Sequence, residues 1–202
     1  MTSTSRYNRG VRVDEHELIR RAQGGDQDAF AQLVVMHAAR VMSLLRRFGL
    51  TAAEADEVGQ EVFLRAWRGL PRFEERAQFS TWLYRIAFNE AKRRLARRPP
   101  LQAEPNADHD DVVAALPASP LQSPDAVALE HEFERTLERA LAQLPPEWRE
   151  AVVLRDLQAL STRDAAAVAG VREAAFKSRL HRGRMQLRVL LEPYLELGTR
   201  AT

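Results

Sequence analysis

The feature that most constrains the fold of this chain is a proline-rich segment near its middle. Between residues 99 and 124 the chain carries six prolines and a single short apolar stretch, VVAAL. Because proline lacks a backbone donor and interrupts helices and strands, no regular element is expected to run through this segment. We therefore expect a linker at 99–124 between domains at 14–98 and 125–195, with tails at 1–13 and 196–202.

The first half carries start and stop signals for four helices. Asp14, Asp26 and Thr51 are good N-cap residues, and each precedes a stretch with apolar residues at helical spacing. Glycines follow each of these stretches, as is common at helix C-termini. Ser80 predicts a cap for the fourth helix, which would then begin near Thr81.

The second half predicts four further helices. The first opens at Asp125 and ends before Pro145, and the second covers EWREAVVLRDLQAL. The third is short, over Ser161–Val168, and the last runs from about Arg172 until Pro193 ends it. No segment of the sequence shows sustained strand-like alternation. The expected fold is all-α, with two small helical domains joined by a proline-rich acidic linker.

Charge is distributed unevenly along the chain, although the net charge is only +2. Residues 76–98 carry seven cations against one acid, and residues 171–188 carry six cations against one acid. Between them, residues 99–134 carry eight acids and no lysine or arginine. Two basic surfaces separated by an acidic segment indicate two contacts with nucleic acid.

Composition and motif content argue against several other classes of protein. The chain has no cysteine, which excludes disulfides, thiolate metal sites and cysteine nucleophiles. Its five histidines have no metal-ligand spacing, and no phosphate loop or nucleophile motif appears. We therefore expect no cofactor, no metal, no small-molecule substrate and no enzymatic activity. The sequence shows no signal peptide and no apolar run of spanning length, so we expect a cytoplasmic protein without membrane insertion.

The segment Gln78–Arg98 combines aromatic and basic residues on one expected helix. Its aromatic residues fall largely on a face that we expect to be buried, while Arg85, Asn89 and Lys92 share an adjacent face. Cations neutralise phosphates and flat rings stack on unpaired bases, so this helix suits nucleic acid. Taken alone, the pattern is more typical of a core helix with a solvated basic face.

A helix–turn–helix is predicted at Ser161–Leu191. Ser161 can cap a short alanine-rich helix, with Asp164 three residues further on, and Gly170 suits a tight turn that needs a positive φ. The following helix places apolar residues on one face and basic residues, among them Lys177 and His181, on the next. A capped short helix, a glycine turn and a basic stripe together favour DNA binding in the major groove.

These segments together resemble the bacterial RNA polymerase sigma factors of the extracytoplasmic-function group. The resemblance lies in GGDQDAFAQLV, DEVGQEVFLRAWRGLPRF and AQFSTWLYRIAFNEAKRRLARR of the first half, and in LPPEWREAVVLRDLQALSTRDAAAVAGV and FKSRLHRGRMQLR of the second. It implies a transcription initiation factor that binds core RNA polymerase, directs it to promoter DNA and helps to melt the minus-ten element. It also implies regulation by an anti-sigma factor.

The resemblance assigns roles to three groups of residues. The DEVGQEVF helix would dock on the polymerase clamp through Asp56, Glu57, Gln60, Glu61 and Phe63. The minus-ten element would be bound by Asn89, which captures a flipped base, with support from Phe79, Trp82, Arg85, Lys92 and Arg93. The minus-thirty-five element would be read by Arg172, Lys177, Ser178, Arg179, His181, Arg182 and Arg184.

The sequence departs from the family pattern at three places. Glu57 stands where aspartate is common, and Gly59 stands where an apolar residue is common, at a cost of roughly 0.5–1 kcal/mol in helix stability. Ala174-Ala175 replaces a common Gly-Thr, which removes a hydroxyl that could cap the helix or bind phosphate. The acidic linker would thread the polymerase channel as an RNA mimic, or serve only as a flexible spacer.

Three other classes of protein were weighed against this interpretation. A stand-alone helix–turn–helix regulator would explain Ser161–Leu191 but neither the aromatic-basic helix nor the acidic DEVGQE face. An enzyme would need a motif that the sequence does not show. A bare helical interaction module would leave the two basic surfaces unexplained.

Overall fold

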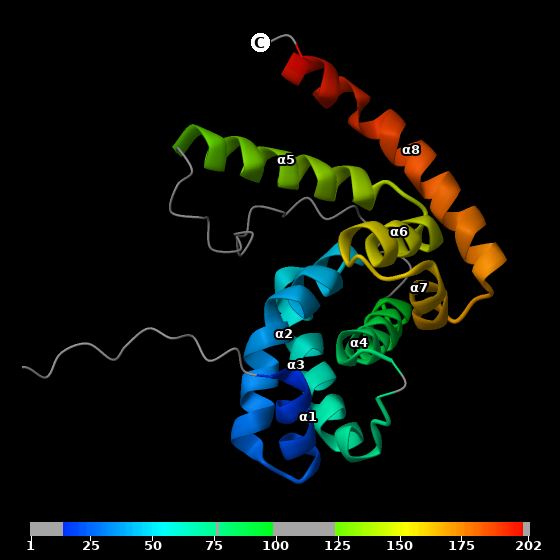
Figure 1. Cartoon of the computed structure of the whole chain (residues 1–202). Helices are drawn as coiled ribbons and strands as arrows, with labels where there is room; N and C mark the ends of the chain where they lie inside the picture. The colour runs from blue at the N-terminus through cyan, green and yellow to red at the C-terminus, as the bar shows by residue number, and fades with distance from the viewer. Residues whose placement is uncertain (1–13, 76, 99–123, 200–202) are drawn as a thin grey trace, which may run out of the picture.

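The computed structural model describes residues 14–75, 77–98 and 124–199, and every regular element in these ranges is helical. The tail expected at 1–13 and residues 99–123 of the linker expected at 99–124 lie outside the described residues, whereas Pro124 is already the first residue of α5. The first half of the chain folds into α1 (Glu15–Gln23), α2 (Gln27–Arg47), α3 (Ala52–Gly69), the short 3₁₀ turn η1 (Leu70–Arg72) and α4 (Phe79–Ala96) (Figure 1). The second half folds into α5 (Pro124–Ala142), α6 (Pro146–Val152), the π-helical turn η3 (Val153–Leu157), α7 (Thr162–Ala169) and α8 (Glu173–Thr199).

The predicted N-caps of the first three helices are confirmed. The Asp14 side chain accepts a hydrogen bond from the backbone N–H of His16 at 3.1 Å, and Asp26 accepts one from Ala29 at 3.0 Å. Thr51 and Glu54 form a reciprocal capping box. Short polar side chains therefore satisfy backbone donors that the first turn of each helix leaves free.

The predicted cap at Ser80 is wrong. Helix α4 begins at Phe79, its N-cap position is Gln78, and no side chain caps it. Phe79 is only 5% exposed and Thr81 is also buried, so the first turn of α4 is part of the core. Burying a phenylalanine contributes about 1.5–3 kcal/mol, which exceeds the roughly 1 kcal/mol of a side-chain cap.

The predicted end of the last helix at Pro193 is also wrong. Helix α8 continues through Pro193 to Thr199, so residues 196–199 of the expected tail are helical, and residues 200–202 lie outside the described residues. A proline within a helix removes one donor, whose partner would be the carbonyl of Val189. Since Val189 is exposed on the surface of α8, water can satisfy that carbonyl.

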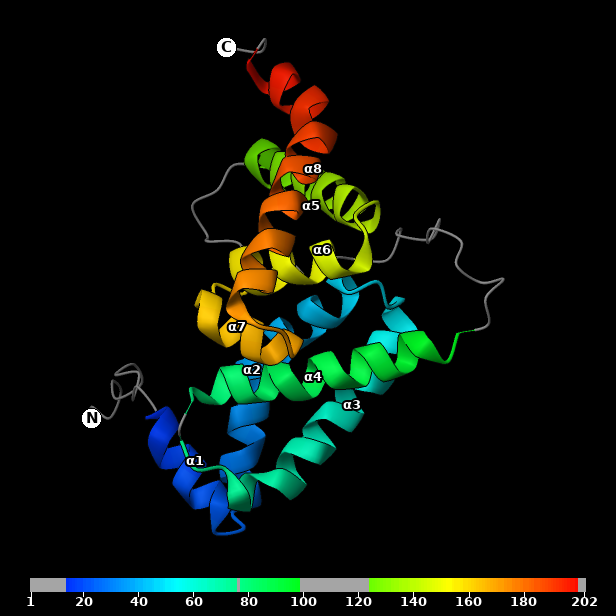
Figure 2. The same ribbon diagram turned by 90° about the vertical axis from the view of Figure 1, so that its right-hand side faces the viewer.

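The two halves of the chain pack against each other. Figure 2 shows α7 lying over α4, and the contact between these helices is one of the larger helix pairings. The Arg149 guanidinium on α6 reaches the carbonyl of Phe48 at 3.5 Å, while it also donates to the carbonyl of Ala142 at 2.8 Å. Burial lowers the pKa of Arg149. The two domains thus share one contiguous apolar core.

One helix in the described part of the chain, α2, is long and apolar enough to cross a membrane by length and composition alone. Leu33, Val41 and Leu44 of this helix are buried against neighbouring helices of the first domain. A core helix passes the same test, so this feature is weak evidence for a membrane span.

Candidate nucleic-acid and protein interfaces

The acidic face of α3 is presented to solvent as the sequence predicts. Asp56, Glu57 and Gln60 are exposed and Glu61 is half-buried, because the opposite face of α3 packs into the core. Phe63 is partly buried and packs against the core, so only part of its ring is accessible.

Leu64 is a candidate that the sequence analysis missed. Its side chain is 50% exposed, and it lies one helical turn after Gln60 on the same surface of α3. An exposed leucine among polar residues is a common feature of protein contacts. The signal was its place on the polar face, opposite the buried Val58 and Val62.

Gly59 lies where α3 crosses α2, which explains the departure from the family pattern. A Cβ atom at this position would lie 2.7 Å from the sulfur of Met42 on α2. The missing side chain therefore gives α2 and α3 room for a close approach, which offsets the intrinsic cost of glycine in a helix.

A polar groove lies between α3 and α4, and acidic residues of α3 face arginines of α4 across it. Its volume is about 380 Å³, and its lining includes the acids of α3 and the arginines of α4. Within it, Arg94 pairs with Glu57 at 3.0 Å. Arg65 pairs with Glu61 at 2.8 Å. Two of the acids proposed for docking are thus already in ion pairs.

Glu54 anchors the C-terminal end of α4 to the N-terminal end of α3. Its carboxylate accepts hydrogen bonds from Arg94 at 3.3 Å and from Arg98. Burial, the largest single influence, raises the pKa of Glu54, but the bonds from Arg98, Thr51 and Arg94 together lower this pKa from 4.5 to about 2. The carboxylate therefore stays charged at neutral pH.

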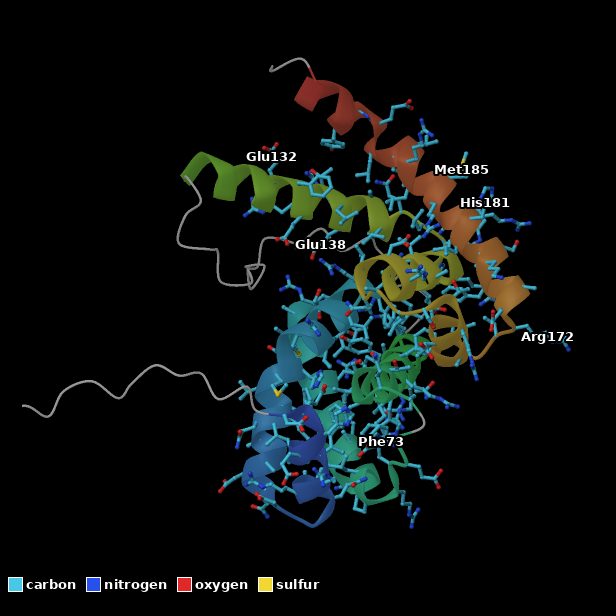
Figure 3. The ribbon with its side chains drawn as sticks, viewed as in Figure 1. Phe73, Glu132, Glu138, Arg172, His181 and Met185 are labelled. Carbon is cyan, nitrogen blue, oxygen red and sulfur yellow. The ribbon has the colours of Figure 1, made fainter. Side chains whose placement is uncertain are left out.

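The predicted minus-ten residues divide into an exposed stripe and an aromatic support. Arg85, Asn89 and Lys92 are exposed along α4, as predicted. Phe79 is buried and Trp82 is half-buried, and their ring centroids lie 5.6 Å apart. These two rings, packed also against Phe73 (labelled in Figure 3), support α4 from beneath.

Arg93 is exposed but does not join the stripe of Arg85, Asn89 and Lys92 directly. Its guanidinium pairs with Glu90 and lines the groove between α3 and α4. Lys92 lies over the ring of Phe88, 5.1 Å from its centroid, and its amine is 3.9 Å from Glu150 of the second domain. Burial raises the pKa of Glu150, while the charge of Lys92 acts in the opposite direction.

The predicted helix–turn–helix is present in α7 and α8. Ser161 caps α7 by accepting from the backbone N–H of Asp164 at 3.1 Å. Gly170 has a φ of 69°, the left-handed conformation expected at the turn. Phe176 and Leu180 bury the inner face of α8, which begins at Glu173 even though Ala174-Ala175 replaces the common Gly-Thr.

The outer face of α8 is basic and open. Figure 3 shows His181 and Met185 along the outer side of the helix, and Arg172 next to its first turn. Other predicted minus-thirty-five residues share this exposed surface: Lys177, Ser178 and Arg182.

Two of the predicted minus-thirty-five residues are already paired within the domain. Arg184 donates from Nε to Asp156 at 2.9 Å and from Nη2 to the other carboxylate oxygen at 2.5 Å. This hydrogen bonding raises the pKa of Arg184. Arg179 is mostly buried and pairs with Glu147 at 3.3 Å. Both arginines therefore lie at the edges of the recognition surface.

No group of three or more potential metal ligands occurs among the residues that the structure describes.

Comparisons with known proteins agree with this arrangement. Residues 33–99 match the family Sigma-70 region 2, and residues 134–187 match Sigma-70, region 4. The chain is 35% identical over 184 residues to the RNA polymerase sigma-H factor of Pseudomonas aeruginosa, which covers 90% of this chain and 95% of that one. It is 32% identical over 186 residues to the ECF RNA polymerase sigma-E factor of Escherichia coli K12, covering 91% and 97% of the two chains.

Solved structures show the same fold. The structure of CnrH in complex with the cytosolic domain of CnrY superposes with a TM-score of 0.63 at 28% identity, covering 89% of this chain and 99% of that one. The sigma factor RpoE in complex with the anti-sigma factor NepR from Bartonella quintana gives a TM-score of 0.60 at 23% identity, over 81% and 96% of the chains.

The chain therefore belongs to the RNA polymerase sigma factors of the extracytoplasmic-function group. Its function is to direct RNA polymerase to specific promoters, as a transcription initiation factor.

Proposed function

We propose that this sigma factor docks on core RNA polymerase through α3 and opens the promoter with α4, while α8 holds the duplex upstream. The observation that carries the proposal is that an acidic face on α3 and the stripe of Arg85, Asn89 and Lys92 on α4 are both exposed, on two different helices. Acidic α3 and basic α4 present different chemistry to different partners while sharing one core. The alternative, a stand-alone regulator of duplex DNA, does not explain the exposed acidic face of α3.

The docking surface consists of residues on one side of α3. Glu57 and Gln60 supply polar contacts, and Leu64 supplies exposed apolar area that a partner can bury. Asp56 and Glu61 flank them, and the accessible part of Phe63 completes the predicted set. Cationic groups on the polymerase clamp would compete with Arg94 and Arg65 for the carboxylates.

The minus-ten surface is the stripe formed by Arg85, Asn89 and Lys92. An amide supplies hydrogen bonds to a flipped base, and the flanking cations bind backbone phosphates. Phe79 supports this surface from the core, and Trp82 offers one partly exposed ring to stack on an unpaired base. Arg93 borders the stripe and lines the groove between α3 and α4.

The minus-thirty-five surface is the exposed side of α8. Arg172 lies just before α8, and Lys177 and His181 lie on the outside of this helix, whose inner face packs against α6 and α7. Ser178 and Arg182 extend this surface, while the paired Arg179 and Arg184 suit phosphate contacts at its edges.

The proposal includes an anti-sigma factor and a cytoplasmic site of action. The structural neighbours named above were solved with CnrY and with the anti-sigma factor NepR, which supports a protein inhibitor for this chain as well. The role is that of a binding factor, without catalysis of its own. The acidic linker at 99–124, expected from the sequence to act as an RNA mimic or only as a flexible spacer, lies outside the described residues except for Pro124.

Titration of core RNA polymerase against the purified chain tests the docking surface. We expect nanomolar to micromolar binding for the wild type, and up to about tenfold weaker binding for Leu64→Ala, since docking would bury the exposed half of a side chain whose full burial contributes roughly 1.5–3 kcal/mol. Gln60→Ala should add to this loss. Because Leu64 is exposed in the free protein, its replacement should leave the melting temperature unchanged.

Val35→Ala is the matched control for the docking test. Val35 is an aliphatic residue on α2 that is even more exposed than Leu64, and it lies outside the proposed surface. Equal affinity of all variants for core polymerase would contradict the assignment of α3. Binding to duplex DNA alone, with none to core, would favour the stand-alone regulator.

A further inference from the structure

Glu90 is a buried carboxylate on the helix that carries the minus-ten stripe. The residue is 8% exposed, and each of its oxygens faces a different arginine. The Nε atom of Arg65 on α3 forms an ion pair with one oxygen at 2.9 Å, and Arg93, one turn further along α4, donates to the other. A buried carboxylate is stable in its charged form only with such partners, so the three side chains hold one another in place.

Arg93 lies at the border between two environments. On one side is the exposed stripe that contains Asn89, and on the other is the groove lined by Glu57 and Glu61. Released from Glu90, the Arg93 guanidinium would be a mobile cation beside the proposed base-capture residue. Such a cation binds phosphates of any sequence, because phosphate contacts carry no direct sequence information.

We propose that Glu90 is a specificity-determining positioning residue. Anchored by Arg65, it holds Arg93 in a fixed orientation beside Asn89 and withholds the arginine charge from backbone phosphates. Sequence-independent binding to single strands is thereby kept weak. The inference rests on the proposed role of α4 in binding the minus-ten element.

The test measures how salt affects binding of the full chain to a fluorescein-labelled single-stranded DNA of random sequence. Glu90→Gln keeps the size of the side chain but removes its charge. The freed Arg93 should gain about one phosphate contact, which steepens the plot of log K against log salt by about 0.7. If the variant and the wild type bind with equal affinity at 1 M KCl, this difference in slope makes the variant bind about eightfold more tightly at 50 mM KCl.

Three further comparisons isolate the pair. Glu17→Gln removes the same charge from an i,i+3 pair with arginine that is exposed and lies away from the stripe, Glu17 with Arg20 at 2.6 Å on α1, and should leave the slope and affinity unchanged. In an Arg93→Gln background, Glu90→Gln should have no effect on the slope. Glu90→Asp retains the charge and should restore a slope close to that of the wild type. Thermal unfolding followed by circular dichroism identifies a temperature at which every variant is folded, and binding is measured at that temperature.

The inference is overturned if Glu90→Gln leaves the slope unchanged, or if it steepens the slope equally without Arg93. Lys92→Ala in the same assay separates this failure from failure of the proposed function. A slope reduced by Lys92→Ala confirms that the stripe binds DNA, so that only the role of Glu90 is lost. A slope unaffected by Lys92→Ala would contradict the minus-ten surface itself.

Discussion

At the scale of single residues, paired charges determine which side chains are free to bind a partner. Helical spacing predicted that Arg85, Asn89 and Lys92 would share an exposed face, and they do. Spacing does not reveal that Arg184 meets Asp156, because these residues come from different helices and meet only in the folded domain.

Glu54 gives a prediction about acid stability. Its folded-state pKa of about 2 lies below its ordinary value of 4.5, so the charged form stabilises the fold above pH 4.5, and this contribution is lost as the pH falls towards 2. The shift corresponds to on the order of 3 kcal/mol at 1.36 kcal/mol per pKa unit, and solvent screening of the partly exposed pairs reduces the contribution to about 1–2 kcal/mol at neutral pH. Glu54→Gln can keep the capping box, since glutamine serves at this position.

Urea unfolding between pH 7 and pH 2.5 measures this contribution. The difference in unfolding free energy between the wild type and Glu54→Gln should be largest near neutral pH and shrink below pH 4.5. Glu132→Gln, an exposed change on α5, is the control and should show little dependence on pH. A difference for Glu54→Gln that stays constant to pH 2.5 would contradict the assigned pKa.

At the scale of elements, close helix crossings depend on small residues. Gly183 is buried where α8 crosses α6, and a Cβ atom there would lie 2.8 Å from Val152 and 2.9 Å from the backbone oxygen of Trp148. Because backbone atoms cannot move aside cheaply, Gly183→Ala should destabilise the protein by about 1–3 kcal/mol despite the better helix propensity of alanine.

Urea midpoints measure the effect at this crossing. Gln186→Ala, an exposed change on the same helix, should match or slightly exceed the wild-type stability. If Gly183→Ala is as stable as Gln186→Ala, then α6 and α8 do not approach as closely as described.

The sequence predicted most elements and fewer of their ends. Short-range signals such as Asp26, Thr51 and Ser161 act on their own first turn, and those caps are confirmed. Ser80 and Pro193 failed as boundary signals, because burial of Phe79 in the core and solvation around Pro193 outweigh the local preference. The need for glycine at position 183 could not be predicted from the sequence, because it arises from the close approach of α6 in the folded protein.

At the scale of the whole molecule, the two domains are joined by contacts as well as by the linker. Arg149 bridges α6 to the end of α2, and Glu150 lies near Lys92 of the minus-ten stripe. The sequence predicted two domains but not this interface. Residues so far apart in the sequence meet only because of how the two folded domains are arranged. The structure thereby places one predicted DNA contact beside the other domain.

The measurement that tests the central claim most directly is promoter opening by holoenzyme with the wild type and with Asn89→Ala. A promoter fragment is first selected from genomic DNA by the holoenzyme, and unpaired thymines are then detected with permanganate. We expect reactive thymines in the minus-ten region with the wild type, and at least a tenfold loss with Asn89→Ala at equal binding to core. Equal reactivity of both proteins would contradict base capture by α4, and with it the proposed division of labour between α3 and α4.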